Sequence, residues 1–147
     1  MTHLPDPVRQ PQFYDGVPFK RLIAWLIDSV LIFLISAIVV LISAFVGLLV
    51  WPLLYLTIGF VYRVVTLANG SATLGMRFAG IEFRSDTGAR LDTSQAVLHT
   101  AGFTVSFAFP VVQVVSVGMM LIDSYGRGLT DMVLGTVAIN RQVVPQR

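Results

Sequence analysis

The sequence predicts an all-α membrane protein: a two-helix transmembrane hairpin, a strand-turn segment, a bent or re-entrant helical segment, and a short C-terminal helix and strand. Charged residues make up only 12% of the chain, about half the roughly 25% of soluble domains. Hydrophobic residues reach 55%, and the mean hydropathy is +0.78. The apolar residues gather in two uncharged runs, 29–62 and 93–122. Runs of this length are typical of segments that lie in a bilayer.

The composition excludes several classes of function. The chain has no cysteine and therefore no disulfide or thiolate metal site. Its net charge of +2 is too small and scattered for a nucleic-acid surface. His3 and His99 lie too far apart for a two-histidine metal motif, and no nucleophile–base set or phosphate loop is present. We therefore expect no catalytic residue, no enzyme activity, no metal and no cofactor.

Residues 1–18 are predicted to form a flexible, extended N-terminal tail. This arm is polar and contains four prolines, which disfavour regular structure. A secretory signal peptide is not expected, because the following apolar run is far longer than the 7–15 residues of such a segment. The membrane domain is predicted to cover 19–141, and 142–147 to form a C-terminal tail.

The first uncharged run predicts two crossings. As one helix, residues 29–62 would extend about 51 Å at 1.5 Å per residue, against a hydrocarbon core of about 30 Å. Gly47 and Pro52 are its only helix breakers. We expect helices near 20–46 and 50–68, joined by a tight turn.

The middle segment, 69–93, is predicted as strand, turn and strand. GIEFR alternates apolar and polar residues, and SDTG is a turn sequence. Open sheet edges cannot face lipid, so this segment must lie at the membrane surface. Near the C-terminus, LTDMVL predicts a short helix and TVAI a strand. GIEF and TVAI can pair only if both lie on one side of the membrane.

The second uncharged run predicts a helical segment over about 94–122 that bends or re-enters. Arginines precede and follow this run, and a single crossing would put one group outside, against the positive-inside bias. Pro110 splits the run into two pieces, neither long enough to span the core. Re-entry on the cytoplasmic side is our preferred interpretation. The alternative is a third full span with the C-terminus outside.

Asp28 is the main functional candidate in the membrane. A carboxylate at a helix centre costs about 2.5–3.5 kcal/mol on insertion scales. Arg21 shares its helix face, about 10 Å away along the axis, and Ala24 between them allows close helix packing. Arg63, on the second helix, is long enough to reach Asp28. Two interpretations stay open: a structural ion pair with Arg63, or a proton or cation site.

Three other polar residues are weaker candidates. A lone histidine such as His99 is more often a hydrogen-bonded interfacial residue than a ligand. Asp123 and Asp131 flank the segment SYGRGLT. Asp131 has two possible roles, a helix-end cap and an ion-pair partner of Arg21 or Arg127.

Three patches in order resemble the RDD family of bacterial membrane proteins. The first is Arg21 with Asp28 in the first helix. The second, similar to G-x-T-x-G-K/R with an offset of one residue, comprises Gly70, Thr73, Gly75 and Arg77. The third, similar to R-x-x-x-D-x-x-x-G-T, comprises Arg127, Asp131, Gly135 and Thr136. The resemblance covers roughly residues 15–141. His99 and Thr130 depart from the family's usual residues.

The resemblance implies a membrane domain with a suggested transport function. The family is named for one arginine and two aspartates, and the resemblance identifies these as Arg21, Asp28 and Asp131. We expect Asp131 to fold back to Arg21, with Asp28 near Arg63 or a cation. Ion or small-solute translocation is one expected function. The alternative is a non-catalytic accessory or assembly subunit of a larger membrane complex. The expected location is the bacterial inner (plasma) membrane, multi-pass with a cytoplasmic N-terminus, with lipid, further copies or a larger complex as partners.

Overall fold

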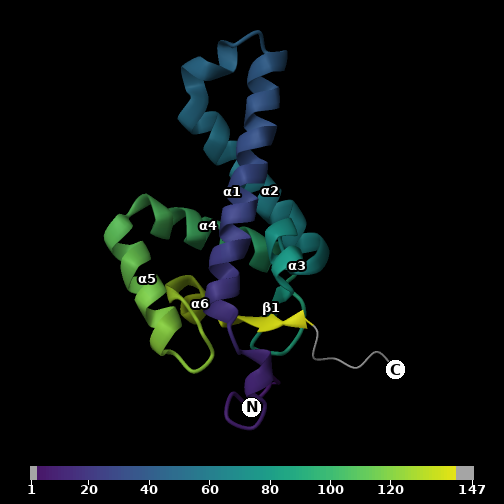
Figure 1. Cartoon of the computed structure of the whole chain (residues 1–147), viewed down its shortest axis with the longest axis vertical. Coiled ribbons are helices and arrows are strands. Elements are labelled where there is room, and N and C mark those ends of the chain that lie inside the picture. Colours follow the sequence, from purple (N-terminus) through teal and green to yellow (C-terminus); the bar gives the residue numbers. More distant parts are fainter. Residues whose placement is uncertain (1–2, 142–147) are drawn as a thin grey trace.

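The computed structural model describes residues 3–141 and is mainly helical, as the sequence predicts (Figure 1). Two long apolar helices rise from a base that holds a two-stranded sheet and the short helices. The elements are α1 (Val17–Ile42), α2 (Trp51–Gly70), α3 (Leu74–Ala79), β1 (Ile81–Ser85), α4 (Thr93–Ala108), α5 (Pro110–Ile122), α6 (Leu129–Leu134) and β2 (Thr136–Asn140), with 3-10 turns η1 (Pro11–Phe13) and η2 (Val46–Val50).

Helices α1 and α2 form the predicted hairpin, and both are long and apolar enough to cross a membrane. The first helix ends at Ile42 rather than at residue 46. Ala44 and Phe45 adopt positive φ angles of 51° and 66°, which a continuing right-handed helix does not allow. Helix α2 begins at Trp51, with Pro52 in its first turn, where a missing amide proton costs nothing.

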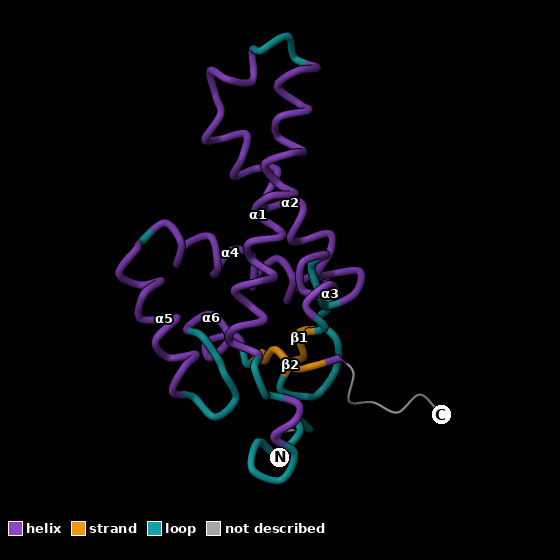
Figure 2. Tube along the Cα trace, in the orientation of Figure 1, coloured by secondary structure: helices purple, strands orange, loops and turns teal. Residues whose placement is uncertain are grey.

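The sheet corrects the prediction for the middle segment. Strand β1 is present at GIEFR, but the second strand expected after the SDTG turn is absent from the described residues. Asp92 instead caps α4, accepting a hydrogen bond from the amide of Gln95. The partner of β1 is β2, paired antiparallel from Ile81 opposite Asn140 to Ser85 opposite Thr136 (Figure 2).

The second uncharged run forms two helices, α4 and α5, and the helix direction bends by 117° between them. The bend lies at Phe109, whose extended conformation is what the residue before a proline adopts. Because α4 follows β1 and α6 precedes β2, the strand pairing returns both ends of the bent pair to one end of the molecule. Residues 93–122 therefore form a bent pair and not one straight helix, as the preferred interpretation of the sequence requires.

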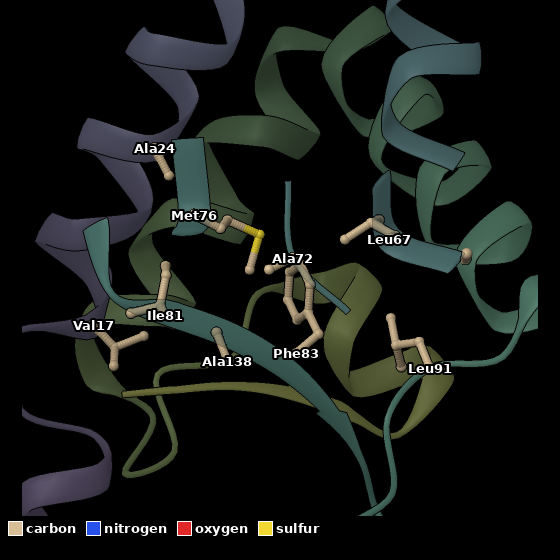
Figure 3. Close-up of a cluster of buried hydrophobic side chains, with 10 residues drawn as sticks. Val17, Ala24, Leu67, Ala72, Met76, Ile81, Phe83, Leu91 and Ala138 are labelled. Carbon is tan, nitrogen blue, oxygen red and sulfur yellow. The ribbon is translucent and has the colours of Figure 1, made fainter. Parts of the chain in front are cut away.

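An apolar core fixes the base to the lower part of α1 (Figure 3). Its buried members come from both long helices, α3, α4, both strands and the loops before α3 and α4: Val17, Ala24, Leu67, Ala72, Met76, Ile81, Phe83, Leu91, Ala96 and Ala138. The N-terminal arm also differs from the predicted extended tail. Tyr14 is buried against Val137 and Ile139, and its hydroxyl donates to the Pro5 carbonyl at 2.7 Å. The predicted tail 142–147 lies outside the described residues.

Candidate functional site

Asp28 lies on the buried face of α1 and joins three helices. Its carboxylate accepts hydrogen bonds from the Tyr62 hydroxyl on α2 at 2.6 Å, the Thr73 hydroxyl at 2.5 Å and the Gly75 amide at 2.8 Å. The side chain is only 2% exposed. Three neutral donors therefore stabilise this buried charge, as a buried carboxylate requires.

The sequence of α3 explains why it can approach Asp28 so closely. Thr73 is the N-cap of α3, and its hydroxyl also accepts the Met76 amide. A Cβ atom on Gly75 would overlap the carbonyl oxygen of Ala24 and lie 2.8 Å from an Asp28 carboxylate oxygen. The two helices therefore need glycine at this point, next to the small Ala24 that the sequence singled out.

Arg63 does not form the expected ion pair with Asp28. No carboxylate oxygen of the described residues lies within 4.0 Å of its guanidinium, which also donates no hydrogen bond to them. The guanidinium carbon lies 3.9 Å from the ring centroid of Phe103 on α4. The half-buried cation is therefore placed by an aromatic face, and its Nε atom is buried without a partner.

Asp131 on α6 meets Arg21, as expected from the third patch. Arg21 donates to Asp131 at 2.5 Å, and His99 lies 2.8 Å away through Nε2. The Thr136 hydroxyl and the Gly128 amide also donate to this carboxylate, at 3.1 and 3.0 Å. Burial raises the pKa of Asp131, but the Arg21 charge and the His99 hydrogen bond outweigh it and hold this pKa below its usual range.

Two candidates near Asp131 have other surroundings than expected. His99 is 2% exposed and faces the Phe83 ring at 4.3 Å, so it is a buried residue rather than an interfacial one. Arg127 pairs with Asp123, not with Asp131, at 3.0 Å. That hydrogen bond lowers the pKa of Asp123.

The other motif residues shape the backbone around these charges. A Cβ atom on Gly70 would meet the Arg77 guanidinium at 2.6 Å, so Gly70 leaves room for that side chain. Gly135 ends α6 with a positive φ of 65°, and it places Thr136 at the start of β2. The second and third patches therefore each have a structural reason for at least one of their glycines.

The charged residues of the site line one cavity of about 450 Å³ beside α1, α4 and α5. Arg21, Asp28, Arg63, His99 and Asp131 all contribute to its wall, and most of the remaining wall is apolar. Cavities of this size that are mainly apolar with a few convergent polar groups are typical of small-molecule sites. Among residues 3–141, no group of three or more metal-ligating side chains is found.

Sequence reasoning missed two members of the site. Tyr62 precedes Arg63 directly, yet nothing in the sequence separates it from the other interfacial tyrosines. Phe103 is one of 10 phenylalanines, and only the packing of α4 against α2 places it under Arg63. A search for donors within one helical turn of Arg63 would have included Tyr62, but no sequence signal points to Phe103.

We compared the chain with known protein families, curated proteins and solved structures, and the family match agrees with the order of the three patches. No curated protein and no solved structure matches the chain. The model of the RDD family matches residues 16–135, which include Arg21, Asp28, Arg63, Arg127 and Asp131. Together with the long apolar helices, this match identifies an integral membrane protein. The chain belongs to the RDD family.

Proposed function

We propose that this protein binds a small ion or solute in the cavity beside α1 and moves it across the bacterial inner membrane. The observation that carries the proposal is the convergence of five ionisable side chains from α1, α2, α4 and α6 on one cavity. Intramembrane ionisable residues are expensive and mark solute or ion pathways by default. The positive-inside bias supports a cytoplasmic N-terminus.

The contacts support a different role for Asp28 from the sequence-based hypothesis, in which Asp28 binds the translocated ion. Its three donors support a role as a junction between α1, α2 and α3. We therefore propose that the open part of the cavity, and not Asp28 alone, receives the solute. A variant of Asp28 tests folding first, so it is a poor test of transport.

Flux through proteoliposomes with a blocked cavity tests this proposal. Vesicles that contain the protein and a pH-, sodium- or anion-sensitive dye are challenged in turn with gradients of protons, sodium and a carboxylate. Val117→Trp fills the cavity wall, whereas Val115→Trp alters the other side of α5, outside the cavity. We expect one gradient to dissipate faster than in empty vesicles, and Val117→Trp alone to reduce that flux at least about tenfold, equivalent to 1.4 kcal/mol. Equal flux in both variants, or none above empty vesicles, would refute transport.

A second candidate function is that of an accessory subunit within a larger membrane complex or an assembly of several copies. Helix α2 favours it, because Leu67 is its only buried residue and the apolar side chains of Leu53, Leu56, Val61 and Val65 are exposed and available to pack on another protein. Purification in mild detergent distinguishes the two functions. A stoichiometric membrane partner without any flux supports the accessory role.

A further inference from the structure

We propose that the cavity binds an amphiphilic anion, with its charged head on Arg63 and its apolar chain between α1 and α5. This inference deepens the proposed function, on which it rests, by naming the chemical class of the solute. It reverses the cation or proton site that the sequence suggested for Asp28. The charged groups of the cavity differ in how fully their hydrogen-bonding positions are already occupied.

Both carboxylates have little capacity left for a cation. An ionised carboxylate has about four lone-pair positions. Asp131 uses four for Arg21, His99, Thr136 and Gly128, and Asp28 uses three. A bound cation would have to displace these donors.

The unused hydrogen-bonding groups in the cavity belong to a positively charged side chain, Arg63. A guanidinium carries five N–H donors, and that of Arg63 donates to none of the described residues. The charge of Arg21 is already paired with Asp131. An unpaired, half-buried charge is unfavourable, and an anionic group can relieve it with two parallel hydrogen bonds. Because Phe103 holds the guanidinium by its face, the N–H groups on its two terminal nitrogens stay free for such a ligand, whereas Nε is buried.

The remaining wall of the cavity fits an apolar chain. Leu22 and Trp25 on α1 line it, with Val117 and Leu121 on α5. Trp25 also contacts Phe107, with ring centroids 6.0 Å apart. A small inorganic anion would leave this apolar surface unused, whereas an anion with an aliphatic chain covers it and gains from its burial.

Fluorescence of Trp25 provides a direct test, since this residue lines the cavity and the chain has only 2 tryptophans. The other, Trp51, lies at the far end of the hairpin and is replaced by Trp51→Phe. The protein is placed in nanodiscs of phosphatidylcholine and titrated with 8-bromooctanoate, whose bromine quenches a neighbouring indole. The probes 8-bromooctylamine and 8-bromooctanol have the same chain with a cationic or neutral head, and they report partition into lipid.

We expect saturable quenching by the carboxylate and only linear quenching by the other two probes. Arg63→Gln should weaken carboxylate binding at least about tenfold, or 1.4 kcal/mol. Arg63→Lys keeps the charge and should bind more tightly than Arg63→Gln. Arg90→Gln removes an exposed positive charge outside the cavity and should have no effect.

The outcomes separate the two proposals. Saturable binding of the amine would overturn the proposal that the ligand is an anion. Carboxylate binding that Arg63→Gln leaves unchanged would overturn it too, although in both cases the cavity still binds a solute. Linear quenching by all three probes in the parent protein overturns the amphiphilic ligand, and the flux experiment then decides the proposed function by itself. The comparison of the three probes needs no Arg63 variant, so it holds even if one fails to fold.

The same anionic head and apolar chain occur in bilayer lipids and in free amphiphiles. A second titration therefore uses nanodiscs that contain phosphatidylglycerol. Weaker apparent binding of 8-bromooctanoate than in phosphatidylcholine indicates that the anionic lipid competes for Arg63. Unchanged binding indicates a free amphiphile as the ligand.

Discussion

Asp131 is fully buried, yet its carboxylate stays ionised because four donors surround it. Arg21 reaches it from α1, 110 residues away in the sequence, and His99 from α4. A buried ion pair of this kind adds little net stability relative to apolar residues, but breaking it by removing one partner is costly. The pair therefore ties α6 to the base of α1.

The lowered pKa of Asp131 predicts a loss of stability in acid. Because the folded pKa lies below the unfolded value of about 3.9, the unfolded chain binds more protons, and stability rises with pH. The contribution is complete above about pH 4 and is lost as pH falls through the folded pKa. We expect Asp131→Asn to lower stability by about 3 kcal/mol at neutral pH and to flatten the acid decline.

Thermal unfolding in detergent between neutral and acidic pH measures this effect. Asp15→Asn is the matched control, because its side chain is exposed. Parallel pH curves for the parent protein and Asp131→Asn would contradict the assignment of the acid response to this carboxylate.

Among the elements, α3 shows how a short helix depends on its neighbours. Its six residues are too few to be stable alone. Contact with α1 through Gly75 and the hydrogen bonds to Asp28 hold it in place. In turn, α3 closes the α1 side of the cavity with Met76.

Two glycine substitutions test this helix contact. Gly75→Ala places a Cβ on the Ala24 carbonyl, so we expect a loss of about 1–3 kcal/mol, as for overpacked cores. Gly118→Ala in α5 meets nothing within 4 Å and should be neutral or stabilising by up to about 1 kcal/mol through helix propensity. Unfolding midpoints of the two variants provide the measurement, and equal effects would argue against close α1–α3 packing.

At the scale of the whole molecule, the pairing of β1 with β2 determines the arrangement in the membrane. It places the start of α4 and the end of α5 at the same end as the start of α1. The α1–α2 turn lies at the opposite end (Figure 1). We therefore predict that the chain crosses the membrane twice and that α4 and α5 enter and return on one side.

Single-cysteine labelling tests this topology without background, since the chain has no cysteine. We expect Ala89→Cys and Ser124→Cys to react with a membrane-impermeant maleimide from the cytoplasm, and Leu49→Cys only from outside. Phe109→Cys at the bend should react from neither side, because re-entrant backbone lies in the membrane. Labelling of Ala89→Cys and Ser124→Cys from opposite sides would require a third span and contradict the strand pairing.

The sequence alone determined the class of protein, the two long apolar helices, the bend at Pro110 and the meeting of Arg21 with Asp131. Hydrophobic length and proline fix the first three, because they act locally and independently of the partners of a helix. The family patches supplied the fourth. They did not specify the contacts between these elements.

Only the tertiary structure decided the partners of Asp28 and Arg63. Sequence reasoning paired the two by opposite charge, but the rotation of α2 brings Tyr62 to Asp28 and turns Arg63 toward Phe103. The structure also decided between the two strand partners that the sequence allowed for β1: it pairs with β2, more than fifty residues away, and not with a strand directly after its turn. Periodicity gives the face of each helix but not its depth or rotation against a neighbour, and those two quantities decide which donor reaches which charge.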